Sequence, residues 1–171
     1  MTWLRIGVAA FVVAAALLLW HAWSHLPELP ARVASHFDAS GRPDGWTDRD
    51  SFSRTTWIMN SLLILLFAGM ATALTRLPVR LFNLPHREFW LAPARADSTR
   101  ITIAGWLLIF GAGLLLFLLF LQDQIMRVNL GQSERSEHLW IALGVFLTAS
   151  LAWTVVLPLR FSRAPGAAPD A

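Results

Sequence analysis

Four long apolar segments limit what this chain can fold into more than any other feature of the sequence. They cover residues 6–23, 55–77, 101–121 and 139–157. A helix that crosses the hydrocarbon core of a bilayer needs about 20 mostly apolar residues, and each segment is close to that length. None has Asp, Glu or Arg in its middle, where such a residue opposes insertion by roughly 2.5–3.5 kcal/mol. The pattern predicts four transmembrane helices.

The alternative is that these segments are buried helices of a soluble protein. Such helices are usually shorter than a membrane span, and four of them in 171 residues leave too little chain to cover them. The composition also favours a membrane, because only 15% of the residues are charged, against about 25% in a soluble domain. We therefore expect an all-α membrane protein of one domain, with four transmembrane helices and the lipid bilayer as its partner.

The first segment has a second interpretation, as a cleaved signal peptide that follows Arg5. Its apolar stretch is long for that purpose, and the bulky Trp20 and Trp23 stand where a cleavage site needs small residues. A retained helix is favoured.

The arginines indicate how the helices are oriented. They are more numerous near both termini and in the loop 78–100 than in the connections 24–54 and 122–138. Positive side chains accumulate on the cytoplasmic side, which predicts cytoplasmic termini, a cytoplasmic loop 78–100 and an extracytoplasmic loop 24–54. The net charge of +3 does not indicate nucleic-acid binding, because the arginines flank apolar segments instead of forming one basic face.

The extracytoplasmic loop has the pattern of a small β-hairpin. Two prolines end the first helix, and Val33, Ser35 and Phe37 then alternate with the residues between them, as in a strand. Turn-forming residues follow at 38–41 and 43–45, where glycine supplies a positive φ. We expect a hairpin-like element on the outer ends of the helices.

This hairpin contains the candidate ligand-binding residues. His36, Asp38 and Asp44 combine an imidazole with carboxylates, a set that suits zinc, and His21 or His25 could complete the coordination. The alternative, which we favour, is that they hydrogen-bond within the turn. With Asn60 of the second span as a floor, the candidate binding set is His36, Asp38, Gly41, Asp44, Trp46 and Asn60.

Asn60 also has a simpler interpretation, as one partner of a hydrogen bond between two helices, worth about 0.6 kcal/mol on average. We slightly favour it over the pocket floor.

The cytoplasmic loop carries an aromatic pair between arginines, which is typical of an anchor in the headgroup layer. A partner-binding role is the alternative. In either interpretation the residues of this loop that matter are Pro85, Phe89, Trp90, Pro93 and Arg95.

Small residues indicate where helices pack closely in lipid. Gly144, Thr148 and Ala152 form the best stripe and could also serve a contact between two copies of the chain. The third segment contributes Gly105, Gly111 and Gly113 in the same way.

Catalytic motifs and cofactor motifs are absent from the sequence. It has no cysteine, no glycine-rich phosphate loop, no His-Glu-x-x-His and no Gly-x-Ser-x-Gly. No span carries the buried ionisable pairs that mark ion pathways. We expect neither a cofactor nor an enzyme or transporter.

Two stretches resemble small bacterial membrane proteins of a domain-of-unknown-function family. One pattern is His-Phe-Asp-x-x-Gly-x-x-Asp-Gly-Trp, matched from His36 to Trp46. The other, Asn-x-Pro-x-x-x-Tyr-Trp-Leu-Ala-Pro-Glu-Arg, is similar to residues 83–95, with Phe89 for Tyr and Ala94 for Glu. The first pattern also occurs in Sdp-type immunity proteins, which protect a bacterium from its own secreted toxin. The resemblance implies a fold and a place in the bacterial inner membrane, but little chemistry.

These observations together lead us to expect a non-enzymatic membrane binding, immunity or signalling-accessory protein, with a secreted peptide or a membrane protein as its partner. One alternative is a metal-dependent membrane hydrolase that uses His36, Asp38 and Asp44. Another is a subunit of a larger complex, joined through the Gly144 stripe. Residues 164–171, rich in Pro and Ala, are expected to be disordered.

Overall fold

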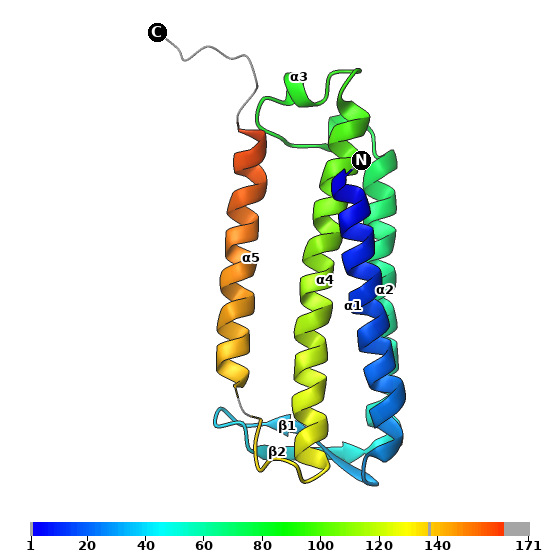
Figure 1. Cartoon of the computed structure of the whole chain (residues 1–171), viewed down its shortest axis with the longest axis vertical. Coiled ribbons are helices and arrows are strands. Elements are labelled where there is room, and N and C mark those ends of the chain that lie inside the picture. Colours follow the sequence, from blue (N-terminus) through cyan, green and yellow to red (C-terminus); the bar gives the residue numbers. More distant parts are fainter. Residues whose placement is uncertain (1, 137, 163–171) are drawn as a thin grey trace.

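Four long helices run side by side in the computed structural model, which describes residues 2–136 and 138–162 (Figure 1). A small two-stranded sheet lies across one end of the bundle, and a short helix lies at the other (Figure 1). We call these the hairpin end and the α3 end. The tail expected at 164–171 lies outside the described residues. The long helices are α1 (Thr2–His25), α2 (Arg49–Arg76), α4 (Ala96–Asn129) and α5 (Leu139–Phe161). The short elements are η1 (Leu26–Glu28), β1 (Arg32–Phe37), β2 (Pro43–Asp48), η2 (Val79–Leu81) and α3 (Arg87–Trp90).

Each long helix is long and apolar enough to cross a membrane, so the described residues contain four candidate spans, as predicted. The helices extend beyond their apolar segments, because hydropathy marks only the part that fits the hydrocarbon core. The largest difference is at α4, which continues to Asn129 although its apolar segment ends at Leu121. The added turns are stabilised by packing, since Met126 is buried against the hairpin end.

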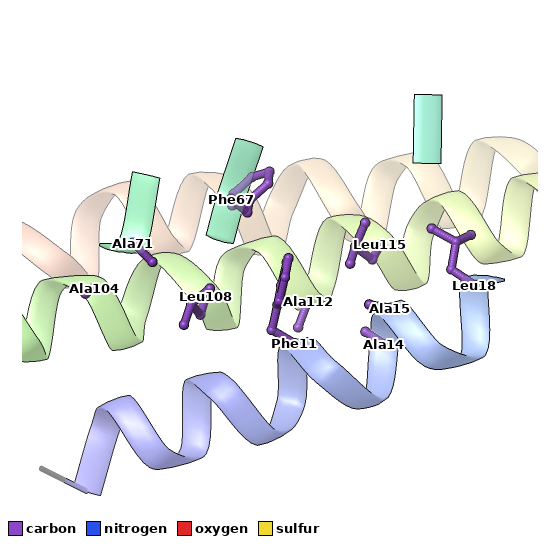
Figure 2. Close-up of a cluster of buried hydrophobic side chains, with 10 residues drawn as sticks. All are labelled: Phe11, Ala14, Ala15, Leu18, Phe67, Ala71, Ala104, Leu108, Ala112 and Leu115. Carbon is purple, nitrogen blue, oxygen red and sulfur yellow. The ribbon is translucent and has the colours of Figure 1, made fainter. Parts of the chain in front are cut away.

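Helix α4 forms the centre of the bundle, with α1 and α2 packed against it (Figure 2). Figure 2 shows the core that they share, in which α1 contributes Phe11 and Leu18, α2 contributes Phe67, and α4 contributes Leu108 and Leu115. Because the interior is filled by aliphatic and aromatic side chains, these three helices form one continuous core.

Glycines allow α1 and α4 to approach closely near the α3 end. A Cβ added to Gly7 would collide with the carbonyl oxygen of Gly105, and one added to Gly105 would lie 2.5 Å from the carbonyl oxygen of Trp3. A Cβ on Gly111 would lie 2.6 Å from the ring of Phe67. Close contacts at Gly105 and Gly111 agree with the prediction, whereas Gly7 was not among the expected packing residues.

Helix α5 is packed differently, because aromatic rings separate it from α4. The Phe117 and Phe146 rings stack with centroids 4.5 Å apart, and the Trp106 and Trp153 centroids are 4.8 Å apart. These bulky pairs set the spacing between the two helices. The small residues of α5 therefore lie elsewhere on its surface.

The prediction that the Gly144 stripe packs against a neighbouring helix is wrong within the described chain. A Cβ at Gly144 would meet nothing within 4 Å, and Thr148 and Ala152 are exposed. A Cβ at Gly113 of α4 would also meet nothing within 4 Å, so the predicted close packing is not seen there either. Spacing alone could not show this, because the aromatic residues decide which face of α5 turns inward.

Candidate binding site

The hairpin consists of β1 and β2 in antiparallel pairing with two irregularities. Ala34 pairs with Trp46 and His36 with Gly45, so Ser35 is an additional residue on β1. Such a bulge turns the side chains that follow it toward the other face. The expected strict alternation is therefore wrong at this point, because Val33 and Ala34 are both buried and Ser35 is exposed.

The inner side of the hairpin is fixed to the bundle. Val33 is fully buried in a second core cluster, together with Ala22 of α1 and Met126 of α4. The side chain of Asn129 accepts a hydrogen bond from the Ala34 N–H at 2.7 Å and donates one to the Ala34 carbonyl at 3.0 Å. The strand therefore cannot move independently of α4.

The turn between the strands is organised by the Asp38 carboxylate. Its Oδ1 accepts hydrogen bonds from the hydroxyl and N–H of Ser40, both at 2.7 Å, and from the Arg42 N–H at 3.0 Å. The Ser40 hydroxyl and then the Arg42 N–H hold the pKa of Asp38 below its usual value. Asp38 thus acts within the turn.

Gly41 joins the tip of the hairpin to the connection between α4 and α5. Its φ of +77° favours glycine, and a Cβ there would lie 2.6 Å from the Ser136 carbonyl oxygen. The Ser136 N–H donates to the Gly41 carbonyl at 2.8 Å, and the Trp140 indole donates to the Ala39 carbonyl at 2.8 Å. Gly41 is therefore needed for the contact between two loops.

The outer side of the hairpin presents three of the expected ligand-binding residues. The ring Nδ1 of His36 lies 2.5 Å from Asp44 Oδ1, and both side chains are largely exposed. Trp46 is 51% exposed. Gly45 makes room for the pair, because a Cβ there would lie 2.8 Å from the His36 Cβ. His36 and Asp44 are eight residues apart in the sequence, and their side chains are in contact. The Asp38 carboxylate instead bonds within its own turn.

No metal centre is formed by these residues. Within residues 2–136 and 138–162, no group of three or more His, Asp or Glu side chains is arranged to hold a metal ion. His25 bonds to Glu28 at 3.2 Å, and His21 lies 3.7 Å from Asp123. Among the described residues, neither histidine therefore joins His36, Asp38 and Asp44 in a coordination shell.

Asn60 lies inside the bundle and not in the hairpin surface. It is 1% exposed, and its amide exchanges hydrogen bonds of 2.8 and 3.4 Å with the amide of Gln122 on α4. This arrangement corresponds to the interhelical hydrogen bond and not to the floor of a pocket.

A polar cavity of about 930 Å³ lies beside the hairpin. Its described lining comes from the hairpin, from α4 and from the connection after α4: Arg42, Pro43, Phe120, Asp123, Gln124, Arg127, Gln132, Ser133, Glu134, Arg135 and His138. Hydropathy alone does not predict this cavity, because it depends on the two turns by which α4 extends beyond its apolar segment.

At the α3 end, Trp90 of the aromatic pair contacts α5. The Trp90 indole donates to the Phe161 carbonyl at 2.8 Å, and the Thr99 hydroxyl donates to the Trp90 carbonyl at 2.8 Å. Arg95 lies over the Phe89 ring, 4.0 Å from its centroid. These contacts make the loop a clamp on the end of α5, in addition to any contact with lipid. Pro85 and Pro93 are exposed on either side of the clamp.

Residues 10–59 match the model of a family described as a domain of unknown function, DUF1648. The match begins within α1, includes the whole hairpin and ends within α2. Neither a curated protein nor a solved structure matches the chain. The matched segment thus contains the candidate residues from His36 to Trp46, whereas the clamp at the α3 end lies outside it.

Proposed function

We propose that this chain is a non-enzymatic binding protein of the bacterial inner membrane, acting in immunity or as a signalling accessory. In this proposal the hairpin faces outward and recognises an extracytoplasmic ligand such as a secreted peptide. The observation that carries the proposal is the hairpin itself. One side is fixed to the bundle through Val33 and Asn129, and the other displays His36, Asp44 and Trp46 to solvent.

Rigid attachment matters because a binding surface that is already ordered loses less conformational entropy when its ligand arrives. An exposed tryptophan is a frequent anchor at protein interfaces. The adjacent His36–Asp44 pair offers a hydrogen-bond donor and acceptor side by side. A polar peptide segment carrying an apolar side chain would match this combination.

The outward placement is supported by the distribution of arginines. The loop 78–100 and the chain ends carry more of them than the hairpin end does. Under the positive-inside rule this distribution favours a cytoplasmic α3 end.

Protection from a secreted toxin tests the proposal. Cells lacking the gene are challenged with concentrated culture supernatant of the parent strain, and survival is compared after complementation with each variant. We expect the wild-type protein and Ser35→Ala, an exposed hairpin control, to protect. His36→Ala, Asp44→Ala and Trp46→Ala should not protect, although immunoblots of isolated membranes show equal amounts of protein.

Full protection by all three variants would refute recognition through the hairpin. If the wild-type protein also fails to protect, the immunity role is wrong.

A further inference from the structure

We propose that the polar cavity at the hairpin end binds the phosphodiester group of a membrane phospholipid. The site is distinct from the recognition surface described above, because His36, Asp44 and Trp46 do not line the cavity. Three observations carry the proposal: the arginines that line the cavity, its charge balance, and its level along α4.

Three arginines from three different parts of the chain line the cavity: Arg42 of the hairpin, Arg127 of α4 and Arg135 of the following connection. The Arg127 Nε is bonded to Asp123 at 2.6 Å, which leaves its two terminal amino groups. Within the described ranges 2–136 and 138–162, the guanidinium groups of Arg42 and Arg135 form no hydrogen bond or ion pair. Guanidinium groups bind phosphate oxygens through paired N–H donors, so these three arginines supply the cavity lining with donors suited to a phosphate.

The charges of the lining match a single phosphodiester. Asp123 and Arg127 neutralise each other, which leaves Arg42 and Arg135 against Glu134. Among the lining residues that the structure describes, three arginines face two carboxylates, which leaves an excess of one positive charge. A phosphodiester carries one negative charge and would balance this excess. Gln124, Gln132 and Ser133 add neutral donors at the cavity wall.

The level of the cavity favours a lipid over a free anion. Its membrane-side edge is Phe120, where the apolar segment of α4 ends, and Arg127 follows seven residues later. Seven residues of helix span about 10 Å, comparable with the headgroup layer of about 5–8 Å on each side of the hydrocarbon core. One turn below Phe120, the stacked Phe117 and Phe146 rings give an apolar seam between α4 and α5. A headgroup in the cavity would therefore place its acyl chains along this seam.

The test uses the full-length protein purified in a mild detergent. Native mass spectrometry counts phospholipids that remain bound, and a titration with a short-chain phosphatidylglycerol gives the apparent affinity. The test variant is Arg42→Gln/Arg135→Gln. The matched control is Arg32→Gln/Arg80→Gln, which removes the same charge from two exposed arginines that do not line the cavity. Circular dichroism verifies that both variants keep their helix content.

We expect the test variant to bind at least about tenfold more weakly, which corresponds to the loss of about 1.4 kcal/mol, while the control binds like the wild type. Equal affinity in both double variants would overturn the proposal. Two further ligands separate the sources of the phosphate. Inorganic phosphate should compete only at far higher concentration, and a short-chain diacylglycerol without phosphate should not bind. Competition by inorganic phosphate at the concentration of the lipid would overturn the assignment to a phospholipid.

Discussion

The side chain of Asn129 and the main chain of Ala34 form two hydrogen bonds although 95 residues separate them. Asn129 lies at the end of α4, and Ala34 lies on β1 just before the bulge at Ser35. The side-chain amide takes the place of a neighbouring strand there, because it accepts from the N–H and donates to the carbonyl of the same residue. This contact holds β1 of the hairpin against the end of α4.

We expect Asn129→Ala to loosen the hairpin without unfolding the bundle. The change leaves the partly buried N–H and carbonyl of Ala34 without their partner, which costs about 1–3 kcal/mol. Hydrogen–deuterium exchange measured by mass spectrometry should become faster in residues 32–48 and stay unchanged in α1 and α2. Asn83→Ala, at an exposed asparagine, serves as the control. Unchanged exchange in the hairpin would show that Asn129 does not fix it.

The four apolar helices and the hairpin could be predicted from the sequence, because both depend on local signals. Apolar length predicts a membrane helix, and Asp38 and Gly41 are typical turn residues. The contacts that position the hairpin have no such signal. Asn129 and Trp140 reach main-chain atoms of Ala34 and Ala39, and a backbone carbonyl looks the same at every position in a sequence.

The candidate site was predicted in part for the same reason. The hairpin pattern brought His36 and Asp44 into one set, and the structure pairs them. The third member, Asp38, binds the N–H groups of its own turn, which is the interpretation favoured from the sequence. The cavity was missed because the polar turns of α4 after Leu121 look like the start of a loop when only hydropathy is considered.

Gly7→Ala should destabilise the bundle, because the added methyl group has no room against the main chain of Gly105. Overpacking of this kind typically costs about 1–3 kcal/mol. The measurement is thermal unfolding in detergent micelles, followed by circular dichroism. Gly113→Ala is the matched control, since nothing lies within 4 Å of its Cβ position. It should be neutral or stabilising by up to about 1 kcal/mol through helix propensity. Equal midpoints for the two variants would contradict the close packing of α1 and α4.

The turn of the hairpin should lose order in acid. Hydrogen bonds from the Ser40 hydroxyl and the Arg42 N–H keep the pKa of Asp38 below its usual value of 3.8. A lowered folded-state pKa means that this carboxylate stabilises the turn above pH 3.8, and that the contribution disappears as the pH falls through the lower folded-state value. The Ser40 amide resonance, followed by NMR, should report a transition in that range. In Asp38→Asn the transition should be absent, and its persistence would assign it to another group.

Two indole N–H groups tie the ends of α5 to the loops, Trp140 at the hairpin end and Trp90 at the α3 end. Because these hydrogen bonds hold the two ends of α5, Trp90→Phe/Trp140→Phe should let α5 take a wider range of positions. Spin labels on Ser61→Cys of α2 and Gly144→Cys of α5 would show this as a broader distance distribution. Trp20→Phe, at an indole that is 68% exposed, is the control and should leave the distribution unchanged. Equal widths in all three proteins would mean that the ring contacts with α4 hold α5 without the indole hydrogen bonds.

The chain contains no cysteine, so single cysteines can report which end of the bundle faces outward. Ser35→Cys lies on the exposed bulge of the hairpin, and Ala94→Cys lies in the exposed loop at the α3 end. Intact cells are treated with a thiol reagent that does not cross membranes, and lysed cells serve as the control in which both positions should react. In the proposed orientation the α3 end lies in the cytoplasm, so we expect only Ser35→Cys to react in intact cells. Reaction of Ala94→Cys alone would invert the orientation. The His36–Asp44 surface would then face the cytoplasm, and a secreted peptide could no longer be its ligand.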